Sequence, residues 1–335
     1  MNRKQVLLVL GGAAAAGAGW TLFRPASGIS MNLWTCLSRR MGGVGTVSSG
    51  AVNRQIPQEE FVSTCARFQK EAMSFTDMPA VVTGLWKSEG FATTFGKYRL
   101  PDNTLDDPRI PRESLGIIHV GYGAACTEFT QFDPAKLTEI ADTKCHKDYK
   151  LLMLEGVGSI LRIYEPGMFK KMCGMMGLIP ADAPDGPDRS GFFKSFMSAF
   201  PEETQRMITH GYGRLVAFSR MSVFDAIGEA KALPADRVPA AVQGVAFAFA
   251  MMNSPDMARV LEASGDMDPD VRGPFQTGLT YGMVFCDWFR PGFLAAWKSQ
   301  GRREGQMIAH AARESEASFA RGHLLPFRLE NPVSA

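Results

Sequence analysis

One short segment recurs six times along this chain and constrains its fold more than any other feature. Each copy is a glycine followed by an apolar residue, usually a small residue, and then a stretch of apolar helix formers. The copies are EGFATTFG (89–96), VGYGAACTEF (120–129), EGVGSILRIY (155–164), HGYGRLVAFS (210–219), QGVAFAFAMM (243–252) and TGLTYGMVFC (277–286). The first glycines of the copies are Gly90, Gly121, Gly156, Gly211, Gly244 and Gly278. Successive glycines are therefore 31, 35, 55, 33 and 34 residues apart. A period near 34 residues is typical of repeats that contain two helices each.

A second helix signal follows each copy: a polar residue, then proline, then an amphipathic stretch. Asp133-Pro134 and Ser254-Pro255 are the clearest cases, and Ser222 marks the copy without proline. Proline is tolerated in the first helical turn, where its missing N–H has no partner, and aspartate or serine before it can cap the free backbone donors. Each unit therefore reads as a helix, a tight turn and a second helix.

The two helices of a unit differ in character. Residues 151–164 and 240–252 are apolar nearly all round, which predicts inner helices, whereas the second helices alternate charged and apolar positions and should form an outer wall. Glycine inside a helix costs about 1 kcal/mol relative to alanine. We interpret the repeated glycines as points where neighbouring backbones approach closely; room for a ligand along the inner face is the alternative.

These patterns predict an all-α fold of about six tandem helical hairpins, arranged as a compact repeat bundle or a short solenoid. Tetratricopeptide-like repeats have a similar period, but the strongly apolar first helices favour a closed bundle over an open superhelix. We expect one helical domain over residues 31–325, followed by a tail at 326–335. A turn-rich insertion near 178–192 accounts for the one long step between glycines.

The first 30 residues have the layout of an export signal or membrane anchor. Arg3 and Lys4 precede an uncharged apolar run over residues 6–23. This predicts a protein that is exported, to the periplasm or cell surface, or anchored in the inner membrane; a true start at Met31 is the alternative. No later segment is long enough to span a bilayer, since the apolar run at 240–252 suits a buried helix.

Charge and motif content exclude several classes of function. The chain has 36 lysines and arginines against 34 aspartates and glutamates, so it lacks the basic field that nucleic-acid binding requires. It has no Gly-x-Ser-x-Gly, no phosphate-binding loop and no His-Glu-x-x-His. The six cysteines include no Cys-x-x-Cys pair, and Cys126 and Cys286 lie in apolar helical runs, which predicts buried free thiols.

Four ionisable residues occupy similar places in four of the copies. Glu89, Glu155 and His210 directly precede their glycines, and His119 lies two residues before its glycine. If all four face one cavity, they could transfer protons or bind a metal. The alternative is that each satisfies a hydrogen bond to a neighbouring helix. We name no metal site and no cofactor.

Two arginines and two tyrosines complete the candidate cavity. Arg162 and Arg214 lie in otherwise apolar helices and need a carboxylate or a ligand anion; Glu155 and Glu128 are the expected structural partners. Tyr122 and Tyr212 directly follow two of the glycines. By contrast, His310 and Glu314 are one turn apart in a polar helix, which favours a solvated face.

The serial Gly-x-Gly helices resemble a family of uncharacterised bacterial proteins called UnbL-like, found with the polyketide cassettes that make enediynes. The resemblance rests on residues 118–123, 155–158 and 210–213, and on Leu33-Trp34 followed by Arg39-Arg40, and covers residues 31 to about 325. It implies an accessory role in an oxidative biosynthetic step, beside a membrane flavoprotein-like partner (UnbU-like) and a repeat-containing partner (UnbV-like). It implies no reaction, because family members have none assigned.

Two classes of function therefore stay open. In the first, the chain is a helical scaffold or accessory protein that binds a partner protein, such as a membrane redox protein, or an apolar small molecule. In the second, it is an enzyme or redox-complex subunit that uses a His- and Glu-lined apolar cavity.

Overall fold

The computed structural model describes residues 57–96, 104–163, 190–220, 222–253, 257–298, 301–322 and 324–329. Within these ranges the chain is helical and contains no strand, which confirms the predicted all-α fold. The leader and residues 178–189 of the predicted insertion lie outside the described residues.

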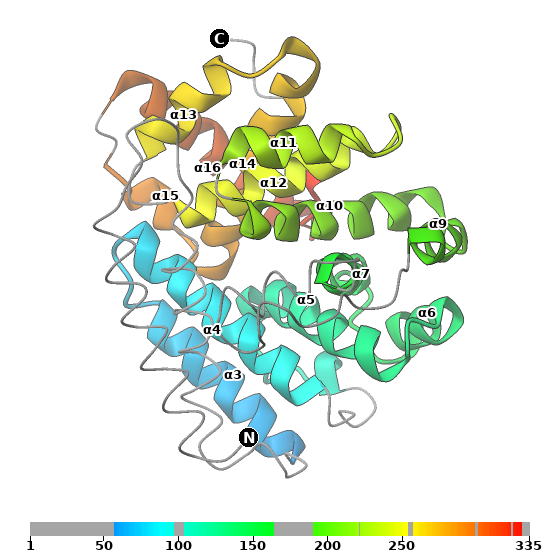
Figure 1. The fold of residues 1–335 in the computed structure, drawn as a ribbon. Coiled ribbons are helices and arrows are strands. Elements are labelled where there is room, and N and C mark those ends of the chain that lie inside the picture. Colours follow the sequence, from blue (N-terminus) through cyan, green and yellow to red (C-terminus); the bar gives the residue numbers. More distant parts are fainter. Residues whose placement is uncertain are drawn as a thin grey trace, which may run out of the picture.

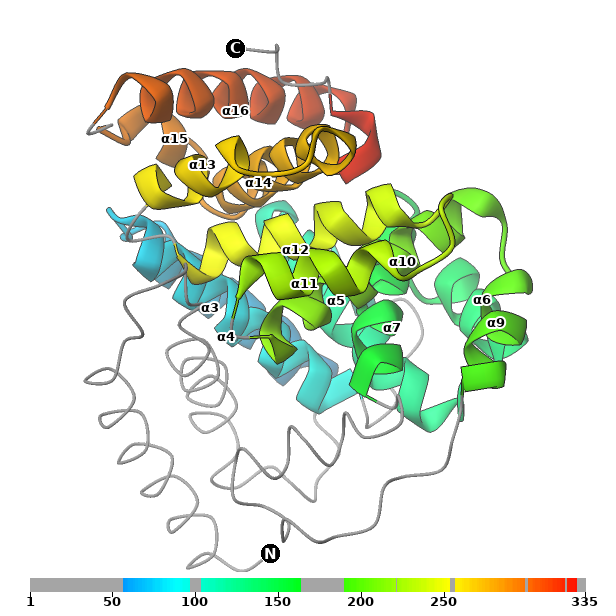
Figure 2. The same cartoon turned by 45° about the horizontal axis from the view of Figure 1, so that its top comes forward.

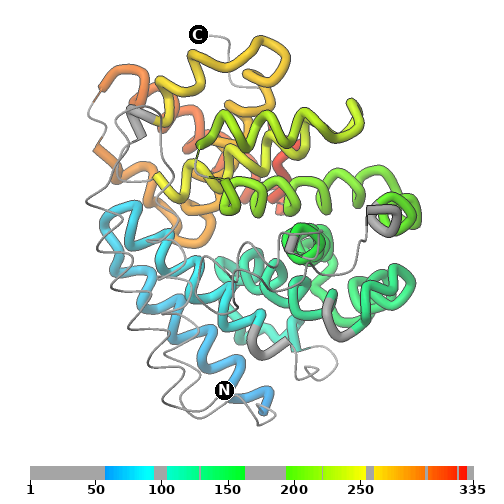
Figure 3. Tube along the Cα trace, in the orientation of Figure 1, coloured from blue at the N-terminus to red at the C-terminus, as the bar shows by residue number. Residues whose placement is uncertain are grey.

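Six inner helices carry the six glycine segments, and each packs most extensively against the next one along the chain (Figures 1 and 3). Their apolar composition explains this position, since α12 buries nearly every residue from Ala240 to Met252. The inner helices are α4 (Met78–Gly96), α5 (Arg112–Phe129), α7 (Lys150–Ile163), α10 (Glu202–Ser219), α12 (Val238–Met252) and α14 (Pro269–Phe289).

Shorter or more polar helices cover the outside of this series. In Figure 2, α16 lies across the outer side of α13 and α14. In α6, only Leu137 and Ala141 are buried, as expected of an outer helix. The outer helices are α3 (Gln58–Ala72), α6 (Pro134–Thr143), α9 (Ser190–Ser198), α11 (Val223–Lys231), α13 (Met257–Gly265), α15 (Phe293–Ala296) and α16 (Arg302–Arg321), with 3-10 turns η1 (Thr104–Asp106) and η2 (Pro326–Arg328).

Two of the predicted helix starts are present. The Asp133 side chain accepts hydrogen bonds from the backbone N–H groups of Ala135 and Lys136, at 3.0 and 3.3 Å, with Pro134 in the first turn of α6. Ser222 caps α11 in the same way through the N–H of Phe224. These caps satisfy backbone donors that a helix leaves free at its start. Ser254 and Pro255 lie outside the described residues.

The segment glycines are places where adjacent inner helices touch backbone to backbone. At five of the six first glycines, an added Cβ would overlap a backbone carbonyl oxygen of the preceding inner helix. In each case that oxygen belongs to the residue directly before the first glycine of the preceding segment. The pairs are Gly121 with Glu89, Gly156 with Val120, Gly211 with Glu155, Gly244 with His210 and Gly278 with Gln243. This confirms close backbone approach as the reason for the glycines, and it gives each pair of inner helices the same register.

The series of inner helices closes on itself, because α14 also packs against α4 and α5. Gln69 Nε2 of α3 donates to the carbonyl oxygen of Phe289, 2.7 Å away, and Arg290 Nε donates to that of Phe75, 3.1 Å away. Residues more than 200 positions apart thus join the two ends of the bundle. The result is the compact bundle that the apolar inner helices favour.

Among the described residues, every helix is too short or too polar to cross a lipid bilayer. The four described cysteines, Cys65, Cys126, Cys145 and Cys286, are buried free thiols, as predicted for Cys126 and Cys286. Burial raises the pKa of each thiol above its ordinary value, so these cysteines are poor nucleophiles.

Candidate functional site

Side chains of α4, α7 and α10 form a central charge cluster, which consists of Glu89, Glu155, His210 and Arg214. Arg214 joins the two carboxylates: its Nη2 lies 3.0 Å from both oxygens of Glu89, and its Nη1 lies 3.0 Å from Oε1 of Glu155. His210 Nδ1 is 3.3 Å from the same Glu155 oxygen. The structure thus brings together four of the eight candidate residues. The Arg214–Glu155 ion pair is the one expected from the sequence.

The central charge cluster is shut off from solvent. The exposed fractions of its four residues are between 0% and 3%. Aromatic rings from α12 and α14 cover it: the Phe247 ring lies 5.2 Å from the Arg214 guanidinium, and the Tyr281 ring lies 5.3 Å from the His210 ring. Phe247 and Tyr281 were not among the residues predicted from the sequence, although each follows its glycine by three residues, as Arg214 does.

Mutual attraction keeps Glu155 and Arg214 ionised despite their burial. Burial raises the pKa of the Glu155 carboxyl, but interactions with His210 and Arg214 outweigh it and hold the pKa below its ordinary value. Burial lowers the pKa of Arg214, and Glu89 and Glu155 outweigh it in the opposite direction. An ionised Glu155 paired with the Arg214 cation is therefore the stable state of this pair at neutral pH.

Several polar atoms of the cluster have no hydrogen-bond partner within the described part of the chain. They are Oε2 of Glu155, Nε of Arg214 and both ring nitrogens of His210; Nδ1 is close to Glu155 but lacks the alignment of a hydrogen bond. Buried polar atoms are nearly always paired with protein or water.

His119 does not join the cluster. Its Nδ1 lies 2.7 Å from the carbonyl oxygen of Leu115, and its Nε2 accepts a hydrogen bond from the backbone N–H of His146 at 3.1 Å. Burial lowers the pKa of His119 to about 4, so the ring is neutral at physiological pH. Its contacts match the alternative of a histidine that hydrogen-bonds its neighbours.

Arg162 also differs from expectation, because among the described residues it pairs with Glu229 of the outer helix α11 rather than with Glu155. The side chain of Glu128, the other expected partner, lies outside the described residues. Tyr212 lies beside this pair, with its ring 5.6 Å from the Arg162 guanidinium, and burial raises its pKa to about 12.

Tyr122 is buried in α5, where it interacts with Cys126 one turn later. None of the contacts described for Arg162, Tyr122 or Tyr212 involves the central charge cluster.

The expectation of a solvated face at His310 and Glu314 is wrong. Glu314 is only 5% exposed, and His310 is half-buried with its Nε2 atom inaccessible and without a hydrogen-bond partner among the described residues. Because α16 packs over α13 and α14, its polar side chains are partly covered by neighbouring helices.

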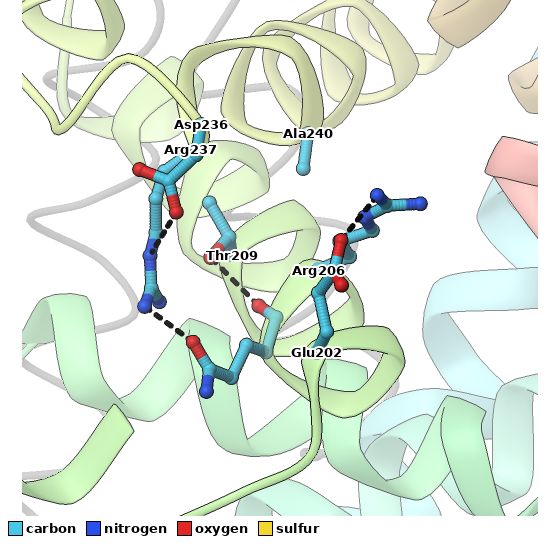
Figure 4. Close-up of a pocket in the computed structure, with 7 residues that line it drawn as sticks. Glu202, Arg206, Thr209, Asp236, Arg237 and Ala240 are labelled. Atoms are coloured by element: carbon cyan, nitrogen blue, oxygen red, sulfur yellow. Dashed lines mark hydrogen bonds and ion pairs between the residues drawn. The ribbon is translucent and has the colours of Figure 1, made fainter. Parts of the chain in front are cut away.

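A surface pocket of about 380 Å³ opens at the start of α10 and α12 (Figure 4). Its charges are already paired: Arg206 Nη2 lies 2.5 Å from Glu202 Oε1, and Arg237 Nε lies 3.7 Å from Asp236 Oδ2. Paired opposite charges leave little net field to select a charged ligand.

Metal binding at the centre is not supported by the geometry. Within the described ranges, no three His, Cys, Asp or Glu side chains are arranged to hold a metal ion. At the central charge cluster, the guanidinium of Arg214 binds both carboxylates that such an ion would need.

Comparisons of the chain with protein-family models, with curated proteins and with solved structures each returned no match.

Proposed function

We propose that this chain is a binding protein rather than an enzyme, and that its helical bundle presents a ligand or partner site on its surface. The observation that carries the proposal is the state of the central charge cluster. Its four side chains are at most 3% exposed, and its carboxylates are engaged by Arg214. Groups that bind one another and cannot meet a substrate are suited to holding helices in register.

The proposal includes the location of the protein and its partner. We propose an exported or membrane-anchored accessory protein, as the leader at residues 6–23 and the resemblance to UnbL-like proteins suggest. Its partner would be a membrane redox protein or an apolar small molecule.

Native mass spectrometry of the tagged full-length chain, purified from its own host, tests the binding role. We expect a small-molecule adduct or a co-purifying protein. The variant Glu155→Gln keeps the size of the side chain while changing the cluster, and its folded fraction should retain the same adduct or partner. Recovery of neither from the unmodified chain would refute the binding role.

An enzyme is the second candidate, and the unpartnered buried atoms of Glu155 and His210 favour it. In that case the two side chains, 3.3 Å apart, would exchange a proton with a substrate held beneath Phe247 and Tyr281. Glu155→Gln discriminates the two functions: an enzyme that uses this carboxylate would lose its activity or bound substrate while remaining folded.

A further inference from the structure

A groove of about 500 Å³ lies between α13, α14 and α16. Its volume is within the range of sites that bind small organic molecules. One face of α16 forms a wall of the groove, because the lining residues Arg303, Gln306, Met307, His310 and Arg313 recur at spacings of three and four. Residues from α13 and α14 form the opposite side.

The charged groups of this α13/α14/α16 groove all have the same sign. Arg303 and Arg313 line it, and no carboxylate does. Both arginines are exposed, and neither forms an ion pair with any residue that the structure describes. This distinguishes the groove from the pocket of Figure 4, where arginines and carboxylates occur in pairs.

One residue that lines the groove has a polar atom that solvent does not reach. His310 lies on the same face of α16, three residues before Arg313, so their side chains are neighbours about one helical turn apart. The buried Nε2 of His310 has no hydrogen-bond partner in the described part of the chain. Because that atom is inaccessible to solvent, the exposed Arg313 is the donor that a ligand oxygen in the groove can reach.

Apolar side chains line the groove as well. Leu261 and Met307 are half-buried and Ala309 is exposed. Arg303 is about 15 Å from Arg313 along the axis of α16, so the groove is elongated. A long ligand with an apolar body fits this shape.

We propose that the α13/α14/α16 groove binds an amphipathic organic carboxylate, with its carboxylate held by Arg313 and its apolar chain on Leu261 and Met307. This inference rests on the proposed binding role and names the site and the ligand class for it.

Isothermal titration calorimetry with dodecanoate, below its micelle-forming concentration, tests the proposal on the full-length chain. We expect saturable binding with one site per chain. Dodecan-1-ol and dodecylammonium carry the same chain without the anion and should bind at least about tenfold more weakly, because a charge-assisted hydrogen bond is lost.

Arg313→Gln should weaken dodecanoate binding about tenfold or more. Arg302→Gln is the matched control, because Arg302 is an exposed arginine of the same helix that does not line the groove. Thermal unfolding of both variants shows that they fold. Absence of saturable dodecanoate binding, equal binding of dodecan-1-ol, or equal weakening by the two substitutions would each overturn the proposal.

The two proposals can fail separately. If an adduct or partner is recovered from the host but dodecanoate does not bind, the carboxylate site is wrong and the binding role remains. If neither is recovered and dodecanoate does not bind, both are wrong.

Discussion

Replacing Gly211 with alanine is expected to destabilise the bundle, although alanine is the better helix former. Gly211 lies in α10 and packs directly on the backbone of Glu155 in α7. An added Cβ would overlap the carbonyl oxygen of Glu155 and would also come close to its carbonyl carbon and Cα. Backbone atoms cannot rotate away as a side chain can, so the two helices must separate.

The size of the effect follows from two opposing terms. Alanine gains up to about 1 kcal/mol over glycine within a helix. Overpacking of a filled core costs about 1–3 kcal/mol and sometimes more, and separation of α7 from α10 would also lengthen the 3.0 Å contact between Arg214 and Glu155. We expect a net loss of about 2 kcal/mol in the free energy of unfolding.

Urea unfolding followed by far-UV circular dichroism measures this loss, and two other glycines provide matched controls. Gly228 is exposed in α11 with nothing within 4 Å of an added Cβ, so Gly228→Ala should stabilise by up to about 1 kcal/mol. At Gly282 the nearest atoms would be 3.2 and 3.3 Å away, and the change should be close to zero. If Gly211→Ala is as stable as the unmodified chain, the backbone contact is not the reason for this glycine.

Three further substitutions test other contacts. Arg214→Met removes the guanidinium that pairs with Glu89 and Glu155 and should cost about 3–5 kcal/mol in urea unfolding; a loss under about 1 kcal/mol would contradict the buried ion pairs. Because the pKa of His119 is lowered from 6.5 to about 4, the unfolded chain binds a proton there that the folded chain does not. Stability should fall by about 3 kcal/mol as the pH drops from 6.5 to 4, and His119→Gln should make this slope shallower; an unchanged slope would contradict the assignment. Asp133→Ala removes two capping hydrogen bonds and should cost about 1 kcal/mol, whereas an unchanged midpoint would show that the cap contributes nothing.

The helical fold was predictable because glycines, prolines and apolar stretches act locally. The Asp133-Pro134 pair capped its helix as expected, and the apolar run at 240–252 became a buried helix. The predicted leader and most of the predicted insertion lie outside the described residues.

The central charge cluster was only partly predictable, and helix geometry explains why. The residue directly before a segment glycine and the residue three after it are four positions apart, so they share one face of the helix. His210 and Arg214 occupy these two positions in α10, and Glu155 occupies the first of them in α7, so the three side chains converge. His119 is two before its glycine, which rotates it by about 100° and directs it elsewhere. Arg162, six after its glycine, reaches an outer helix for the same reason. The positions of His119 and His210 look nearly equivalent in the sequence, but the one-residue difference places the two side chains on different faces.

The contact of α14 with α4 and α5 limits how the number of helices in such a protein can evolve. An open array of helix pairs can gain or lose a pair at either end, because each pair meets only its neighbours. Here, deletion of one pair would leave the first and last inner helices too far apart to meet, and an extra pair would force them past each other. Variation in length should therefore accumulate in the connecting loops, while the number of inner helices stays fixed.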